Sequence, residues 1–239
     1  MHRYSFNGTA ADSVGDASWT GTLGTAAKIS GGQLQLPGGS SSSYLQLPAG
    51  ILGSPAPSAV SIEMWITTAS TGNSGGYNRI FQFGSHTTGI ANEGNPGSLV
   101  FSRNSGNNGF QLVSYGTVAP TQTASQAATT ADTLTTVFNN QTNLHVVINL
   151  YNGGYGWVYI NGLLVGSTQA TGLILPIGSP GEINLIGLGT DYTVPGMVGS
   201  VDEFRIWSGV LSLPTILNHN NFGPNQNLGR VIYWWKMTK

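Results

Sequence analysis

Carboxylate side chains are the first candidates for chemistry, because paired acids catalyse glycoside hydrolysis. A retaining glycosidase needs an acid and a nucleophile about 5 Å apart. Glu63 is the one acid in the apolar run 60–66, whereas Asp202 and Glu203 are neighbours in sequence. Adjacent residues of an extended strand point to opposite faces. This spacing does not place two acids side by side, so we assign Glu63 and Glu203 structural roles and expect no catalytic residue.

Histidines and nucleophile motifs indicate no catalytic or zinc site either. The four histidines are scattered, with no pair four residues apart, and the chain has no cysteine. Zinc sites need clusters of nitrogen or sulfur ligands. The sequence has no convincing nucleophile elbow and no phosphate-binding glycine loop before a helix. We interpret the many glycines as turn residues.

Aromatic and polar side chains in predicted loops are the candidates for ligand binding. Sugars stack their C–H faces on aromatic rings, and their hydroxyls bond to amide, carboxylate and guanidinium groups. Loop positions with this chemistry are Tyr77, Asn78, Arg103, Asn104, Tyr155, Asp191 and Tyr192. Single exposed aromatics are common on any protein, so this set is a hypothesis. Four aromatic residues inside predicted strands are expected in the core instead: Trp65, Phe81, Trp157 and Phe204.

Composition limits the possible partners and the location. Charged residues make up only 7% of the chain, and the net charge is −1. No basic stripe is present to neutralise a run of phosphates, so nucleic acid is excluded as a partner. No apolar stretch approaches the roughly 18 residues of a membrane helix, so we expect no membrane insertion. Abundant Gly, Ser, Thr, Asn and Gln are typical of exported β proteins, so we expect an extracellular or cell-surface protein.

Short apolar runs separated by turn residues predict an all-β fold. Helical periodicity is nearly absent. The predicted strands are 3–6, 33–36, 44–47, 60–66, 79–83, 98–103, 110–113, 145–151, 156–160, 163–166, 182–186, 200–207 and 231–235. Alternating apolar and polar residues indicate one buried face for each strand, as in a two-sheet antiparallel β-sandwich. A sandwich of this length usually forms one domain.

Two hairpins and one long loop can be placed from turn chemistry. Runs 33–36 and 44–47 flank a Gly- and Ser-rich loop, which predicts a hairpin. The Asn161-Gly162 pair between apolar runs is the strongest short-range hairpin signal, and it predicts a three-strand meander over 145–166. The Thr-rich segment 116–137 is expected to be a long surface excursion.

Five segments occur in the order of a known domain family. They are 2–8 with the Asp12 loop, 60–66, 79–84, 157–162, and 199–207 followed by 211–224. Together they resemble the laminin G-like domains of the concanavalin A-like lectin and glucanase superfamily. The resemblance implies a concanavalin A-like jelly roll over residues 1–227, with residues 228–239 as a tail that adds a strand or contacts a partner. The glucanase branch carries a Glu-x-Asp-x-(x)-Glu array, which the run 60–66 lacks.

The resemblance also implies a structural metal site at Asp12 and Asp202. It places the first strand beside the closing strand and the Asp12 loop near Asp202, where family members often hold Ca²⁺. The ion takes six to eight oxygen ligands, so backbone carbonyls of 7–21 and water would complete the shell. Alternatively, Asp12 caps a turn, and Asp202 pairs with Arg205 or a backbone amide.

These observations favour a non-catalytic carbohydrate-binding or adhesion module, a lectin-like domain of an exported protein. Its partner would be a glycan or a cell-surface protein. The alternative is a structural component of a cell surface, filament or virion that self-associates through the tail, because one fold hosts many functions. A glycoside hydrolase or polysaccharide lyase is the third class, for which no acid–base pair emerges.

Overall fold

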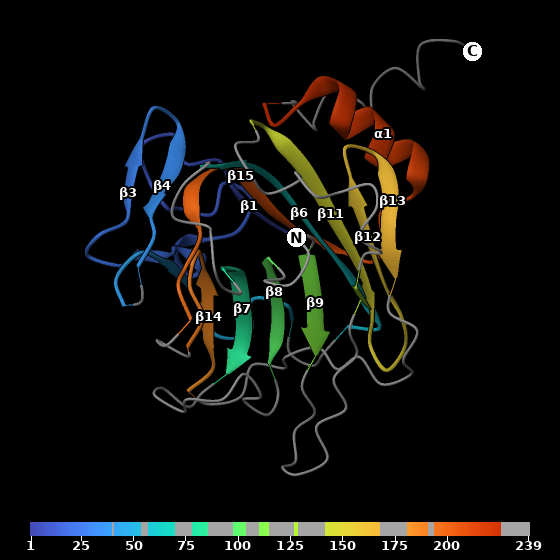
Figure 1. The fold of residues 1–239 in the computed structure, drawn as a ribbon, viewed down its shortest axis with the longest axis horizontal. Helices are drawn as coiled ribbons and strands as arrows, with labels where there is room; N and C mark the ends of the chain where they lie inside the picture. Colours follow the sequence, from blue (N-terminus) through green and yellow to red (C-terminus); the bar gives the residue numbers. More distant parts are fainter. Residues whose placement is uncertain are drawn as a thin grey trace.

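Two antiparallel sheets pack face to face and form the body of the protein (Figure 1). The structure, a computed structural model, describes residues 1–39, 41–53, 57–69, 78–85, 98–103, 110–114, 127–128, 142–167, 181–190 and 194–225. The two packed antiparallel sheets confirm the predicted β-sandwich. Within these residues no helix is long and apolar enough to span a bilayer.

The strand order of each sheet defines which residues are neighbours. Sheet A runs β13 (Leu163–Ser167), β12 (Gly156–Ile160), β11 (Leu144–Tyr151), β6 (Ala59–Thr68), β15 (Val198–Ser208), β4 (Gln33–Pro37) and β3 (Lys28–Ser30), and β1 (His2–Tyr4) also pairs with β15. Sheet B runs β10 (Ala127–Ala128), β9 (Phe110–Ser114), β8 (Leu99–Arg103), β7 (Arg79–Ser85), β14 (Ile183–Ile186), β5 (Leu45–Leu47) and β2 (Thr22–Leu23). A short 3₁₀ helix, η1 (Ala17–Trp19), and an α-helix, α1 (Leu213–Phe222), complete the described elements.

Every predicted strand within the described residues is present, with ends that differ by no more than two residues. The predicted strand 231–235 and the tail 228–239 lie outside the described residues. Of the Thr-rich segment 116–137, only β10 is described, and it pairs with β9. The short strands β2 and β3 were not predicted, because two or three residues carry too little pattern.

The predicted hairpin of runs 33–36 and 44–47 is wrong. The first run forms β4, which pairs with β3 and β15 in sheet A. The second forms β5, which pairs with β2 and β14 in sheet B. Gly38 and Gly39, both at positive φ, lie in the connection between the sheets. The leucines of the two strands therefore meet in the core from opposite sheets.

The predicted meander is confirmed, since β11, β12 and β13 are successive antiparallel neighbours. Asn161 and Gly162 adopt φ of 50° and 81°. A two-residue type I′ hairpin turn requires positive φ at both central residues.

The first and closing strands lie side by side, as the resemblance implied. Tyr4 on β1 is the register partner of Phe204 on β15. Phe204 also contacts Phe83 of sheet B, with ring centroids 6.1 Å apart in an edge-to-face arrangement. Phe81 and Phe204 are fully buried in the core, as expected. The strand pairing thus places the N-terminal segment against the closing strand, with Tyr4 in the core.

Helix α1 was not predicted, although its boundaries carry recognisable signals. Ser212 caps the N-terminus by accepting a hydrogen bond from the Thr215 amide, Pro214 lies in the first turn, and Gly223 follows at φ 75°. These are ordinary start and stop residues of a helix. Only Ile216 and His219 are buried along it, so an apolar periodicity is almost missing from its sequence.

Gly199 on β15 provides a test of the close packing between β15 and β6. It has φ 153°, and a Cβ at this position would lie 2.0 Å from the Thr67 carbonyl oxygen. We expect Gly199→Ala to lower the free energy of unfolding by about 3 kcal/mol, because a backbone clash adds to backbone strain. Gly209→Ala is the control, since Gly209 has φ 83° but open space around it; its strain alone costs about 1 kcal/mol. If chemical denaturation showed that the two variants lose equal free energy of unfolding, the close packing of β15 against β6 would be contradicted.

Candidate functional site

The Glu63 carboxylate lies on the outer face of sheet A, the face turned away from sheet B, and accepts four hydrogen bonds. His145 Nε2 and His219 Nδ1 lie 2.9 and 2.8 Å from its Oε1 atom. Arg205 Nη1 and Trp207 Nε1 lie 3.3 and 2.9 Å from Oε2. A carboxylate only accepts, so each histidine donates the proton on the nitrogen that faces Glu63.

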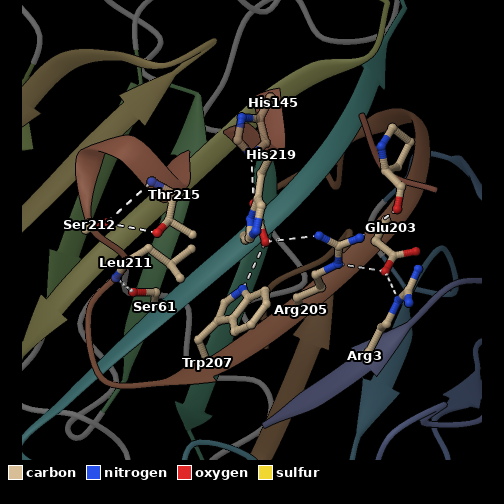
Figure 2. Close-up of polar contacts among 12 residues, drawn as sticks. Arg3, Ser61, His145, Glu203, Arg205, Trp207, Leu211, Ser212, Thr215 and His219 are labelled. Carbon is tan, nitrogen blue, oxygen red and sulfur yellow. Dashed lines mark hydrogen bonds and ion pairs between the residues drawn. The ribbon is translucent and has the colours of Figure 1, made fainter. Parts of the chain in front are cut away.

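A second buried acid extends this cluster along the sheet. Glu203 Oε1 accepts hydrogen bonds from Arg3 Nε and from Arg205 Nε, the latter at 2.8 Å. Arg205 Nη2 also donates to the Pro224 carbonyl at 2.6 Å. Figure 2 shows Arg3, Glu203 and Arg205 in line, with Trp207, His145 and His219 beside them. We call Arg3, Glu63, His145, Glu203, Arg205, Trp207 and His219 the Glu63 network.

Aromatic contacts support the same network. Trp65 lies between His145, stacked at a centroid distance of 4.4 Å, and the Arg205 guanidinium, 4.7 Å from its ring. His219 stacks on Trp207 at 5.4 Å. Trp65 is buried as expected, but it lies on the outer face of the sheet and outside the core between the sheets.

The Glu63 network holds α1 and its flanking residues against sheet A. His219 is on α1, and Pro224 follows it. At the other end of the helix, the Leu211 amide donates to Ser61 Oγ at 2.9 Å, and Asn149 Nδ2 donates to the Leu211 carbonyl at 2.9 Å. The helix and its flanking residues therefore contact β6, β11 and β15 on the outer face of sheet A.

Burial and hydrogen bonding act in opposite directions on the Glu63 carboxyl. Burial raises its pKa, but hydrogen bonds from His145 and His219 and the electrostatic contributions of His219 and Arg205 outweigh this and lower the pKa to about 2. Glu63 and Glu203 are both fully buried. A general acid or nucleophile must reach its substrate, so the structural roles predicted for these two acids fit their surroundings.

Asp12 and Asp202 each have partners of their own. Asp12 Oδ1 accepts from the amides of Arg3 and Val14 at 2.9 and 3.0 Å, and Oδ2 lies 2.6 Å from His2 Nδ1. Asp12 therefore caps a turn, as the alternative interpretation expected. Burial raises its pKa, but these hydrogen bonds outweigh the effect and lower it.

Asp202 makes a different contact from either of those considered. Its Oδ2 accepts from Gln33 Nε2 at 3.2 Å, while Arg205 pairs with Glu203. Within the described part of the chain, no group of three or more His, Asp or Glu side chains could hold a metal ion. The structure does not test the expected calcium site, but the donors already bound to Asp12 do not fit a Ca²⁺ ion there.

The predicted ligand-binding residues divide into three groups. Tyr77, Asn104, Asp191 and Tyr192 lie outside the described residues. Asn78 and Arg103 lie together on sheet B, since the Arg103 amide donates to the Asn78 carbonyl at 3.0 Å. Both were expected at loop positions, and both side chains are buried; ligand binding by them stays a prediction. They come at the ends of strands where other residues cover them. Tyr155 is exposed, as predicted.

Tyr155 belongs to an exposed aromatic group that we call the aromatic corner, formed by Tyr151, Tyr155 and Trp157. The two tyrosines are 37% and 47% exposed, and Trp157 is half-buried. The Trp157 ring lies 5.2 Å from Tyr151, edge to face, and 6.3 Å from Tyr155. Trp157 was expected in the core, which is wrong because its neighbours Gly156 and Val158 occupy the buried positions of β12.

A second surface lies at the other side of α1, on β3, β4, β15 and β6; on it Lys28 is exposed, Gln35 and Thr67 are half-buried, and Ser200 is buried. Lys28, Gln35, Ser200 and Thr67 are successive register partners across these four strands. We call these residues the polar row. They line an open groove of about 540 Å³. Sequence reasoning missed this row because the four residues are far apart in the chain and become neighbours only through strand order.

Replacing Glu63 tests the network. We expect Glu63→Gln to lower the free energy of unfolding at pH 7 by about 3 kcal/mol, because Arg205 loses a buried charged partner. The native pKa is about 2 and the ordinary value is 4.5, so ionised Glu63 stabilises the fold above pH 4.5. That contribution is lost as the pH falls toward 2.

The difference between wild type and Glu63→Gln should therefore shrink over this pH range in denaturation experiments. Asp16→Asn is the control, because Asp16 also has a lowered pKa, from hydrogen bonds with Ser18, but is exposed. A constant difference down to pH 2 would contradict the role of the Glu63 charge.

The calcium site can be tested by thermal unfolding. Because the Asp12 oxygens already accept hydrogen bonds, we expect the same Tm in Ca²⁺ and in EDTA. A ligand that binds only the native state would raise Tm. A rise with Ca²⁺ that Asp12→Asn abolishes would establish the site and overturn our interpretation of these hydrogen bonds.

Solved structures with a similar fold include sugar-bound domains. One is domain 4 of AbnA, a GH43 extracellular arabinanase from Geobacillus stearothermophilus, in complex with arabinotriose; the TM-score is 0.59 at 19% identity, covering 91% of this chain and 96% of that chain. Another is the binding domain of botulinum neurotoxin DC, in complex with SialylT (TM-score 0.62, 16% identity) and with rat synaptotagmin II (0.61, 15%). In both cases 93% of this chain is covered, and it spans 50% and 51% of those chains. At these identities the likeness shows the fold alone.

The sequence comparison assigns the family. No curated protein matches the chain. The laminin G family model described as "Concanavalin A-like lectin/glucanases superfamily" matches residues 38–217. This range contains β5 to β15, which include strands of both sheets. The chain therefore belongs to the concanavalin A-like lectin/glucanases superfamily, as its five ordered segments predicted.

Proposed function

We propose that this chain is a non-catalytic carbohydrate-binding module of an exported protein. The observation that carries the proposal is the aromatic corner, where two exposed tyrosines flank a half-buried tryptophan. Aromatic rings with a solvent-exposed edge and an apolar face suit the C–H faces of sugars. An extracellular location follows from the same proposal.

The position of the aromatic corner supports a preformed surface. Tyr151 ends β11, and Trp157 lies on β12, opposite Asn149. The Tyr151 amide donates to the Tyr155 carbonyl at 2.9 Å, which closes the turn between the strands. Rigid strands and a closed turn fix the rings before a ligand arrives, which reduces the entropy lost on binding.

Two further observations support binding over catalysis. The two acids of the Glu63 network are buried and engaged by arginines. The similar arabinanase domain, which this chain covers almost completely, was solved with arabinotriose. The alternative role as an assembly component through the tail depends on residues 228–239, which lie outside the described residues.

Binding should depend on the aromatic corner. We expect a glycan array of plant, algal and host oligosaccharides to give at least one ligand. For that ligand, Trp157→Ala and Tyr155→Ala should each weaken the Kd about tenfold in calorimetry, because a stacking surface is lost.

The control is Phe222→Ala, since Phe222 is the most exposed aromatic among the described residues and lies on α1. The Phe222→Ala variant should bind the glycan with the affinity of the wild type. Unchanged melting temperatures would show that all three variants are folded. Silence across the array, or an equal loss in Phe222→Ala, would overturn the proposal.

A further inference from the structure

The polar row has the dimensions and shape of a ligand site. Its four residues lie on four adjacent strands, and strands are spaced about 4.8 Å apart, so the row is about 14 Å long. The groove of about 540 Å³ falls within the range of small-molecule sites. Pro37 and Val198 also line the groove beside the polar side chains.

The groove offers both hydrogen-bond donors and acceptors. Gln35 Nε2 donates to Gln33 Oε1 and to the Ser30 carbonyl, so Gln35 Oε1 remains as an acceptor. Thr67 Oγ1 accepts from the Asn143 amide at 3.2 Å, so its hydroxyl proton remains to donate. Ser200 Oγ donates to Gln33 Oε1 at 3.0 Å and keeps its lone pairs. This mixture matches the hydroxyl groups of a sugar.

Lys28 adds a positive charge that no described residue neutralises. Among the described cations, Arg3 and Arg205 pair with Glu203, and Arg79 and Arg103 are buried. Lys28 is exposed and makes no hydrogen bond or ion pair within the described residues. An ammonium group at one end of a row of hydroxyl and amide groups suits an anion on a polar ligand.

Asp202 is linked to the polar row through Gln33, and it already accepts a hydrogen bond. Asp202 accepts from Gln33 Nε2, and Gln33 Oε1 accepts from Ser200 and Gln35. Gln33 thus lies between the Asp202 carboxylate and two residues of the row. Asp202 does not line the groove.

We propose that the polar row binds a carboxylated saccharide, with Lys28 pairing with the carboxylate and Gln35, Ser200 and Thr67 bonding to hydroxyls. This inference rests on the proposed carbohydrate-binding function and adds a second site with its own ligand class. The aromatic corner lies at the Ala59 end of β6, whereas the row crosses β6 at Thr67. The two sites are therefore separate.

The test compares acidic oligosaccharides with their methyl esters, which have the same shape and no carboxylate charge. The probes are oligogalacturonide, oligomannuronate and sialyllactose, titrated calorimetrically into the full chain. We expect at least one acid to bind about tenfold more tightly than its ester. Lys28→Gln should remove this preference, and Lys28→Arg should keep it. Binding of the acid should also weaken with salt.

The control is Thr22→Ala, an exposed change on β2 in the other sheet, which should leave the preference unchanged. The inference is overturned if no acid is preferred to its ester, or if Lys28→Gln retains the preference. If neutral glycans still bind through the aromatic corner in that case, only this second site fails. If no glycan of either kind binds, the proposed function fails as well.

Discussion

The burial of one carboxylate, that of Glu63, determines how the outer face of sheet A is organised. An isolated charge removed from water is very costly unless it is paired and hydrogen-bonded. Here the four donors come from β11, β15 and α1, while Glu63 itself is on β6. Satisfying this charge therefore fixes the helix to three strands at once. The helix in turn leaves two accessible surfaces, the aromatic corner on one side and the polar row on the other.

The same network explains why the accessible chemistry of the described surface is mostly neutral. Arg3 and Arg205 are engaged by Glu203, and Arg205 also binds Glu63. Charges used to hold α1 and β1 in place are not available to a substrate. The aromatic corner and the polar row instead offer aromatic rings, an amide, hydroxyls and Lys28, which suit reversible recognition of a polar ligand better than acid–base catalysis.

The sequence allowed the strands to be predicted better than their partners. Alternation of Gln33 to Leu36 identifies a strand with one buried face, but it does not show whether the next such strand lies in the same sheet or the opposite one. The Asn161-Gly162 turn was predictable because its chemistry is local. The partners of Glu63 were not, since His145, Arg205 and His219 reach it only through strand order and the docking of a helix with little apolar periodicity.

The polar row shows how hydrophobic register can create a polar site. Leu34 and Leu36 are buried in the core, and Gln35 between them must then face outward, where register places it opposite Lys28 and Ser200. A slip of one residue would turn Gln35 into the core and expose the leucines. The register is thus held by core packing, and the alignment of the polar groups follows from it. A binding surface built this way is as rigid as the sandwich beneath it.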